Sequence, residues 1–372
     1  MPESALQSAS NAEALIGRLA EYRELLDLLT QRPGLTVIAA DPLSGTTALV
    51  GSVIDELDGA HVVVDARSCA DGLDLAMAVA DAAVDRLAPE ATAWWTGNAP
   101  PSSVAGLRLS RTLSEKGIDL DELRLGAGPA ERRLSEAVEL LLALTDGDAV
   151  LVIDHLGPML SALPRERARH LLDGLRTARQ EHPALELVLI EHQDGPMASA
   201  LADQSHPLYR AGQVMRLRRA KPSRFVGDLA IAGPWTDAPV DLIGAAAELA
   251  SGVPGLTWRT IDLAPVAGEE VHARALTGWR ELRRVTAVPT ARQWDLLRRV
   301  HPLAQSVVAA TGLGLRPHAV EANPKSINDT LVRLRDLGVA WQPEPRRWAL
   351  ADPLLAAWVR DHPPPWAERR RS

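Results

Sequence analysis

The segment Leu35–Val50, LTVIAADPLSGTTALV, constrains the fold of this chain more than any other stretch. It opens with a short apolar run rich in residues that favour β-strands. It then turns through a loop that contains Pro42 and Gly45, and the residues after Gly45 are typical of a helix start. A buried strand that passes through a tight turn into a helix is a building unit of folds with a parallel sheet. The sequence therefore predicts an α/β protein.

The turn in this segment is similar to a phosphate-binding loop in which several residues differ. Aligned on the pattern G-x-x-x-x-G-K-[ST], the loop runs from Ala40 to Thr47, and only Gly45 and Thr47 match. Thr46 stands where the pattern has the lysine that reaches the β- and γ-phosphates. Asp41 adds a carboxylate that would repel a polyphosphate at short range. From this segment alone, a strand, turn and helix that bind no ligand remain an equal alternative.

Length and residue counts limit the class of protein. A chain of 372 residues predicts about two or three domains. The single cysteine, Cys69, excludes an internal disulfide framework and a cysteine-rich zinc site, and favours a reducing cytoplasm. We find neither a signal peptide nor an apolar run of about 18 residues, so we expect a cytoplasmic protein that does not span a membrane. The ten histidines show no H-x-x-x-H pairing, so we expect no structural metal.

The charge of the chain is unevenly distributed. Residues 1–270 contain 23 Lys and Arg against 39 Asp and Glu, a net charge of −16. Residues 271–372 contain 17 against 9, a net charge of +8. Such asymmetry is typical of a nucleic-acid-binding module joined to an acidic body, although an acidic partner protein would suit the basic part equally well.

A second candidate motif follows the predicted loop at a suitable distance. The run Ala149–Asp154 is apolar and ends in an acid, which is the form of a Walker B strand whose aspartate lies beside Mg²⁺. His155 stands where an active ATPase of the AAA type has the glutamate that orients the attacking water. If nucleotide binds, Thr47 and Asp154 are the expected Mg²⁺ ligands. Gln193, after a further buried strand, occupies the place of the residue that senses the γ-phosphate.

Three short motifs extend the resemblance to most of the chain. They are Ile16-Gly17-Arg18 before a helix, Pro207-Leu208-Tyr209-Arg210 before the strand Gln213–Leu217, and the turn Gly252-Val253-Pro254. In these motifs and their order, residues 14–362 resemble a family of P-loop ATPases found predominantly in archaea, although the glycine expected before Arg210 is missing. The resemblance implies a set of nucleotide-binding residues: Arg18, Ala40, Gly45, Thr46, Thr47, Gln193 and Arg210.

The C-terminal part has the pattern of a winged helix-turn-helix. Helices are expected at Ala291–Val300, Leu303–Thr311 and Lys325–Leu337, the last with Ile327, Leu331, Leu334 and Leu337 on its buried face. A two-stranded wing follows, turning at Pro343–Pro345. Packing of this module on the ATPase body or on a partner is the alternative to DNA binding. The candidate DNA contacts are Lys325, Ser326, Asn328, Arg333, Arg346 and Arg347.

The fold class that we predict is α/β: a P-loop NTPase parallel-sheet core of the AAA type, a small helical lid and a C-terminal winged helix-turn-helix domain. The expected parts are a disordered N-terminus (1–13), a degenerate core (14–220) with an irregular insertion (88–130), a lid and linker (221–285) and a winged-helix domain (286–372).

The predicted function is that of a regulatory or scaffold protein with weak or lost nucleotide binding, in which Asp154 and His155 form a degenerate catalytic pair. The candidate cofactor is ATP with Mg²⁺, and no other cofactor is expected. The possible partners are double-stranded DNA, a partner protein or further copies of the chain, and no membrane is expected. The alternative function is a slow ATP-dependent switch.

Overall fold

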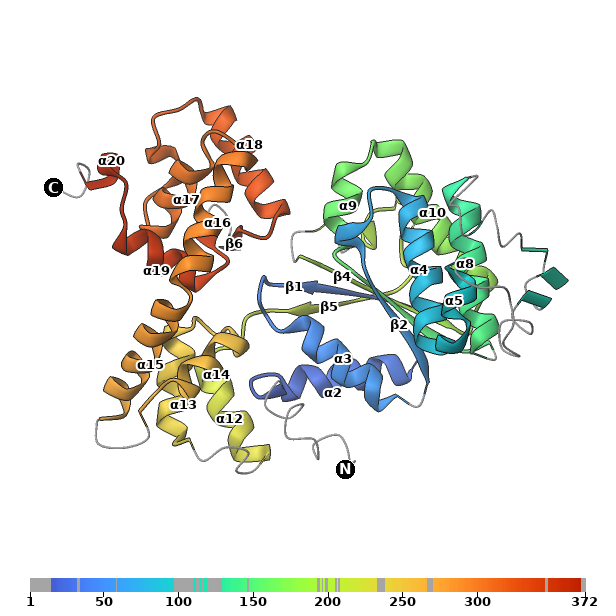
Figure 1. The fold of residues 1–372 in the computed structure, drawn as a ribbon, viewed down its shortest axis with the longest axis horizontal. Helices are drawn as coiled ribbons and strands as arrows, with labels where there is room; N and C mark the ends of the chain where they lie inside the picture. The colour runs from blue at the N-terminus through green and yellow to red at the C-terminus, as the bar shows by residue number, and fades with distance from the viewer. Residues whose placement is uncertain are drawn as a thin grey trace. The chain divides into compact units, whose positions relative to one another are not determined.

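The computed structural model describes residues 15–368 except 32–33, 58, 97–109, 112–113, 116, 119–122, 124–128, 146, 193–194, 196, 198–199, 205, 207, 233–237, 266–269 and 345–346 (Figure 1). The predicted disordered N-terminus and most of the predicted insertion at 88–130 lie outside the described residues. The chain divides into two compact units. One consists of Arg23–Ala40 and Val50–Leu217, and the other of Met1–Tyr22, Asp41–Leu49 and Arg218–Ser372.

A five-stranded parallel sheet forms the centre of the first unit. Its three central strands are buried along nearly their whole length, which explains why their sequences are continuous apolar runs. The two edge strands are partly exposed, and Val63 and Val214 face outward there. In spatial order the strands are β2 (Ala60–Asp65), β3 (Ala149–Asp154), β4 (Leu185–His192), β1 (Leu35–Ala40) and β5 (Gln213–Leu217).

Successive side chains of a strand point to opposite faces of a sheet, and this alternation separates the two faces here. The face that includes Val37, Leu151 and Leu187 contributes to one large apolar core beneath the helices. On the opposite face, Ile38 and Val188 are also fully buried, so the sheet is covered on both sides. The crossover segments are η1 (Ala66–Ser68), α4 (Gly72–Leu87), η2 (Pro89–Ala91), α5 (Thr92–Trp95), α8 (Ala130–Leu144), α9 (Leu156–Ala162) and α10 (Arg165–Glu181).

Two helices, α2 (Leu19–Thr30) and α3 (Thr46–Glu56), run across the boundary between the units in sequence. In the second unit, the turn before α2 is fixed by Gly17, which has φ +87°. A Cβ at Gly17 would lie 3.1 Å from the ring of Phe225, closer than an ordinary van der Waals contact, and the positive φ itself favours glycine. The main-chain N–H of Leu19 donates to Asp228 Oδ2 at 3.0 Å, which caps the first turn of α2.

Phe225 and Asp228 belong to a group of four helices in the second unit. Buried Ile16, Phe225 and Ile243 form one small core of this group. The turn before the third helix depends on Gly252, because a Cβ there would lie 2.0 Å from the carbonyl oxygen of Ala220. The four helices are α12 (Pro222–Ala232), α13 (Val240–Leu249), α14 (Pro254–Asp262) and α15 (Val271–Val285).

The remaining elements of the second unit are helices and a hairpin. Three helices precede an antiparallel hairpin in which Ala340 pairs with Leu350. Gly338 has φ +67° and stands just past the end of the third helix, where glycine readily adopts this left-handed backbone. The elements are α16 (Ala287–Val300), α17 (Ala304–Gly312), η3 (Pro317–Ala319), α18 (Pro324–Asp336), β6 (Ala340–Glu344), β7 (Arg347–Leu350), α19 (Pro353–Asp361) and α20 (Pro365–Glu368).

One residue of α18 departs from the predicted burial pattern. Ile327, Leu331 and Leu334 are buried as expected, whereas Leu337 is 58% exposed. Leu337 is the residue after the last helical turn, where the chain leaves the helical spacing that carries the other three toward the core. In the described part of the chain, no helix combines the length and the apolar character of a membrane span.

Candidate functional site

The loop Ala40–Thr47, which the sequence predicts to be a degenerate phosphate loop, is held together by its own short-range hydrogen bonds. Ser44 N donates to the carbonyl oxygen of Asp41 at 3.2 Å, and Leu49 N donates to that of Gly45 at 3.0 Å at the start of α3. Two residues adopt left-handed backbone, Leu43 with φ +59° and Gly45 with φ +83°. A non-glycine residue in this region is strained, and such strain is often found in ligand-binding loops.

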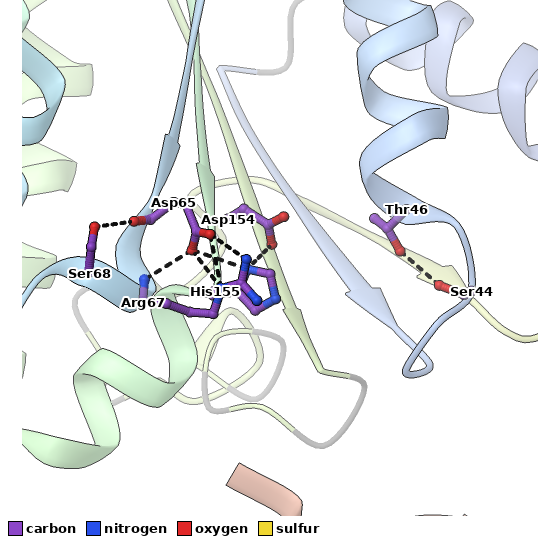
Figure 2. A network of polar contacts seen from close by, with 7 residues as sticks. All are labelled: Ser44, Thr46, Asp65, Arg67, Ser68, Asp154 and His155. Atoms are coloured by element: carbon purple, nitrogen blue, oxygen red, sulfur yellow. Dashed lines mark hydrogen bonds and ion pairs between the residues drawn. The ribbon is translucent and has the colours of Figure 1, made fainter. Parts of the chain in front are cut away.

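Thr46, at the position of the phosphate-contacting lysine, is turned into the loop. Its hydroxyl lies 2.8 Å from the hydroxyl of Ser44, and both side chains are buried (Figure 2). A neutral hydroxyl that is already hydrogen-bonded offers no positive charge to a phosphate group. Of the other predicted loop residues, Ala40 ends β1 and Thr47 lies in the first turn of α3.

Asp41 is the acidic residue of the loop, and it is 5% exposed. Its Oδ2 atom accepts a hydrogen bond from the main-chain N–H of Arg219 at 2.8 Å, and Arg219 Nε donates to the carbonyl oxygen of Pro42 at 3.0 Å. Burial raises the pKa of Asp41 above 3.8, and the hydrogen bond and positive charge of Arg219 offset only part of this effect. Burial also lowers the pKa of Arg219 to about 10.

Arg219 has further contacts outside the loop, in the same unit. Its Nη2 atom donates to the carbonyl oxygen of Ala351, just after β7. Its guanidinium carbon lies 5.0 Å from the ring centroid of Trp341 in β6, within cation–π distance. Sequence reasoning missed Arg219, because no local pattern marks an arginine whose partners are so far away in the chain.

Arg18 is the predicted nucleotide-binding residue nearest to the N-terminus, and it is 1% exposed. Its Nε atom donates to the carbonyl oxygen of Ser44 at 2.9 Å, and its Nη1 atom lies 3.5 Å from Glu21 Oε1. Burial lowers the pKa of Arg18, partly offset by Glu21. Arg18 therefore holds the loop through the main chain of Ser44. Of the predicted nucleotide-binding residues, the structure brings Arg18, Gly45 and Thr46 together.

The lid turn predicted from Gly252-Val253-Pro254 also meets the loop. A Cβ at Gly45 would lie 3.4 Å from the Cγ atom of Pro254, the first residue of α14. A side chain at position 45 would therefore touch Pro254. Pro254 thus lies near the loop, and Arg18 and Arg219 donate hydrogen bonds to it, all within one unit.

A second polar group lies at the carboxyl end of the sheet (Figure 2). Asp154 ends β3 as predicted, and His155 follows with φ +59°, which places its Nδ1 atom 3.0 Å from Asp154 Oδ1. The same Nδ1 atom lies 3.4 Å from Asp65 Oδ1. Asp65 is held by Arg67 Nε at 3.0 and 2.9 Å, and these hydrogen bonds lower the pKa of Asp65.

Asp65 is a site residue that the sequence reasoning missed. It ends β2, and it pairs in register with Asp154 on the neighbouring strand. The parallel order of these two strands was the signal that could have placed the two carboxylates side by side. His155 Nδ1 thus lies within ion-pair distance of both carboxylates. Among the described residues, however, no three acidic, histidine or cysteine side chains form a metal-binding cluster.

Arg210 lies away from this edge of the sheet. It comes three residues before β5 begins, and it lines a cavity together with Leu35, the first residue of β1. In a parallel sheet with strands of six residues, the amino and carboxyl ends of the strands lie about 17–20 Å apart. The structure therefore does not bring Arg210 together with Asp154, and Gln193 lies outside the described residues.

The candidate DNA contacts lie on α18 and on the hairpin. Lys325, Asn328 and Arg333 are exposed, and Ser326 is partly exposed. Asn323 caps the helix by accepting a hydrogen bond from Lys325 N at 2.9 Å. Arg333 Nη1 lies 3.3 Å from the carbonyl oxygen of Val300, and exposed Arg347 begins β7 beside Glu344. Arg346 lies outside the described residues.

The fold is similar to that of two solved structures. The Walker-type ATPase PABY2304 of Pyrococcus abyssi has a TM-score of 0.61 and 19% sequence identity, over 92% of this chain and 95% of that chain. The ORC2 protein of Aeropyrum pernix, in its ADPNP–ADP complexes, has a TM-score of 0.48 and 13% identity, over 95% and 93%. No protein-family profile and no curated protein sequence matches the chain. The first similarity shows that the chain has the fold of a P-loop ATPase.

Proposed function

We propose that this chain is a regulatory or scaffold protein on an ATPase fold, which does not hydrolyse ATP and binds duplex DNA through α18 and the β6–β7 hairpin. One observation carries the proposal. The hydroxyl of Thr46, at the position of the phosphate-contacting lysine, is buried and lies 2.8 Å from the hydroxyl of Ser44. The loop therefore presents no lysine to a nucleotide phosphate.

Two further substitutions support the loss of hydrolysis. Ala40 replaces the first glycine of the loop, and His155 replaces the glutamate that would orient water. Buried Asp41 adds a carboxylate to the loop. Phosphoryl transfer depends on cations and a positioned water acting together, so the combined losses are expected to abolish turnover.

The DNA-binding part of the proposal rests on charge and exposure. Residues 271–372 carry a net charge of +8, and Lys325, Asn328 and Arg347 are exposed on the helix and the hairpin that would face the duplex. Lysine and arginine suit phosphate contacts, and asparagine suits a base edge. A partner protein would replace DNA in this proposal if the intact chain showed no salt-dependent DNA binding.

Nucleotide binding tests the proposal directly. A ligand that binds only the folded state stabilises it by about 2.7 kcal/mol at 100 times its dissociation constant. We expect millimolar Mg-ATP to leave the melting temperature of the intact chain unchanged and phosphate release to remain at background. Tight Mg-ATP binding, with hydrolysis that Asp154→Ala abolishes, would contradict the proposal.

A slow ATP-dependent switch is the second candidate function. Its support is the contact between His155 Nδ1 and Asp154 Oδ1 at 3.0 Å, which leaves a group able to accept a proton beside the carboxylate of the Walker B strand. Single-turnover measurement with excess protein tests it. If turnover is seen, and falls in His155→Ala but not in His170→Ala on the exposed face of α10, the switch replaces the scaffold.

A further inference from the structure

Three arginines line a cavity at the amino end of the sheet, at the opposite end from Asp154. The cavity has a volume of about 320 Å³. Arg176 and Arg179 come from α10, and Arg210 comes from the turn before β5. Leu35, the first residue of β1, forms part of its wall. The degenerate phosphate loop follows the other end of β1.

Two glycines leave room for this arrangement. A Cβ at Gly34 would lie 2.0 Å from Arg179 Nη2, so glycine at this position allows the guanidinium to lie over the chain. A Cβ at Gly212 would lie 2.1 Å from the carbonyl oxygen of Leu35, so glycine there allows the turn that carries Arg210 to approach β1. The leucines of the wall, including Leu175 and Leu208, are buried. The cavity is therefore an apolar pocket with cationic groups around it.

The arginines have no acidic partner among the described residues. No aspartate or glutamate is part of the lining, and none of the three guanidinium groups forms an ion pair there. Arg179 Nε is buried and has no hydrogen-bond partner in the described part of the chain. An unpaired buried donor costs about 1–3 kcal/mol, and like charges that converge on one cavity repel. A bound anion would remove both penalties.

The backbone at Arg210 gives independent support. Arg210 has φ +55°, a conformation that is uncommon for a residue with a side chain. It is held there by a hydrogen bond from its N–H to the carbonyl oxygen of Leu201 at 3.1 Å. Its guanidinium carbon lies 5.2 Å from the ring centroid of Tyr209, which also lines the cavity. Strained backbone that aims a cation at a pocket is typical of binding sites.

We infer that this cavity binds a small phosphate-bearing molecule. Planar guanidinium groups bind phosphate oxygens through paired hydrogen bonds, and several of them around one pocket suit a multivalent anion better than a single carboxylate. A volume of about 320 Å³ falls at the small end of the range for small-molecule pockets. The concave apolar wall favours a small molecule over the extended phosphate backbone of a nucleic acid.

The probes are inorganic phosphate and pyrophosphate, titrated into the intact chain by calorimetry at constant ionic strength with a metal chelator present. We expect saturable binding that is stronger for pyrophosphate than for phosphate. Arg179→Gln should weaken pyrophosphate binding by at least about tenfold, because paired hydrogen bonds to the anion are lost. Arg179→Lys, which keeps the charge but loses the planar fork, should restore part of the affinity.

Arg167→Gln is the matched control, since Arg167 is an exposed arginine on the same helix that does not line the cavity. It should change the affinity by less than about twofold, as expected for a surface charge. An unchanged melting temperature without ligand verifies that each variant is folded. The inference fails if pyrophosphate does not bind, or if its affinity is the same in Arg179→Gln as in the unmodified chain. It also fails if a short DNA duplex displaces pyrophosphate from the pocket, which would assign the arginines to nucleic acid. None of these results depends on whether α18 binds DNA.

Discussion

The main-chain N–H of Arg219 donates a hydrogen bond to Asp41 Oδ2 at 2.8 Å, across 178 positions of sequence. This bond connects a carboxylate of the loop Ala40–Thr47 to the segment just after β5. The side chain of Arg219 then donates to the carbonyl oxygens of Pro42 and Ala351. The loop is consequently braced by protein groups, and Arg219 connects it to the end of the β6–β7 hairpin.

Changing Asp41 separates its charge from its role as an acceptor. Asp41→Asn keeps an oxygen for the N–H of Arg219, whereas Asp41→Ala leaves that donor without its partner. We expect Asp41→Ala to lower the free energy of unfolding by about 1–3 kcal/mol at neutral pH, and Asp41→Asn to lower it far less. Chemical denaturation of the three proteins measures the difference. Equal losses in both variants would mean that the charge, and not the hydrogen bond, matters here.

The contribution of Asp41 to stability should change with pH in a defined direction. Burial raises the pKa of Asp41 above 3.8, so the folded protein holds this proton more tightly than the unfolded chain does. The stability contributed by proton binding at Asp41 is fully present below the unfolded pKa, and it is lost as pH rises through the higher folded value. The free energy of unfolding of the unmodified chain, relative to Asp41→Asn, should therefore fall with rising pH over that interval. A difference that stays constant from acid to neutral pH would contradict this assignment.

Arg219 should be more important for stability than its exposed neighbour. Arg219→Ala removes two hydrogen bonds and the contact with the Trp341 ring, and we expect a loss of about 2–4 kcal/mol in the free energy of unfolding. Arg218→Ala is the matched control, because Arg218 is exposed and should change stability by no more than about 0.5 kcal/mol. Hydrogen exchange of the loop amides should also speed up in Arg219→Ala alone. Similar losses in the two variants would show that net charge is responsible.

Restoring the phosphate-loop residues should separate binding from hydrolysis. Ala40→Gly with Thr46→Lys returns the first glycine and the cation, and we expect measurable Mg-ATP binding by calorimetry. Phosphate release should still require His155→Glu, because the water-orienting carboxylate is a separate part of the machinery. Thr46→Gln, added to Ala40→Gly, controls for side-chain length without charge. Hydrolysis at the same rate with and without His155→Glu would contradict this division.

DNA binding by the intact chain should depend on salt and on α18. Each phosphate contact that is lost reduces the slope of log affinity against log salt by about 0.9, so Lys325→Ala should weaken binding to all duplexes and flatten that slope. Asn328→Ala should instead change the preference between sequences. Arg292→Ala, an exposed arginine of α16, is the control with an equal charge change. If all three variants behave alike, the helix does not face the duplex.

Strands and helix faces could be predicted, because they depend on residues that are close together in the sequence. A buried parallel strand has to be a continuous apolar run, so the residues of β1 and β3 could be read from the sequence with Asp154 at the end of its strand. Helical spacing likewise identified Ile327 and Leu331 as core residues of α18. Leu337 was placed wrongly, because the periodicity was extended one residue beyond the last helical turn.

The parts of the site that sequence reasoning missed depend on contacts between distant residues. The bond from Arg18 to Ser44 spans 26 positions, and the one from Arg219 to Pro42 spans 177. No local pattern encodes such pairs. Arg210 is a related case: its short motif was recognised, but the end of the sheet at which it lies depends on the register of β5 against β1. The residue types indicated which groups could bind a ligand, but the fold determined which of these groups lie near one another.

The bracing of the loop by Arg219 bears on the order in which the protein matures during synthesis. The loop emerges from the ribosome before its partner at position 219, and the acceptor at Ala351 follows a further 132 positions along the chain. Domains generally fold from the N-terminus as they are made. During synthesis, Asp41 and Pro42 therefore remain in contact with water and lack their hydrogen bonds to Arg219 until Arg219 has been translated. The loop is therefore expected to reach its final form only after segments that are made much later than it is.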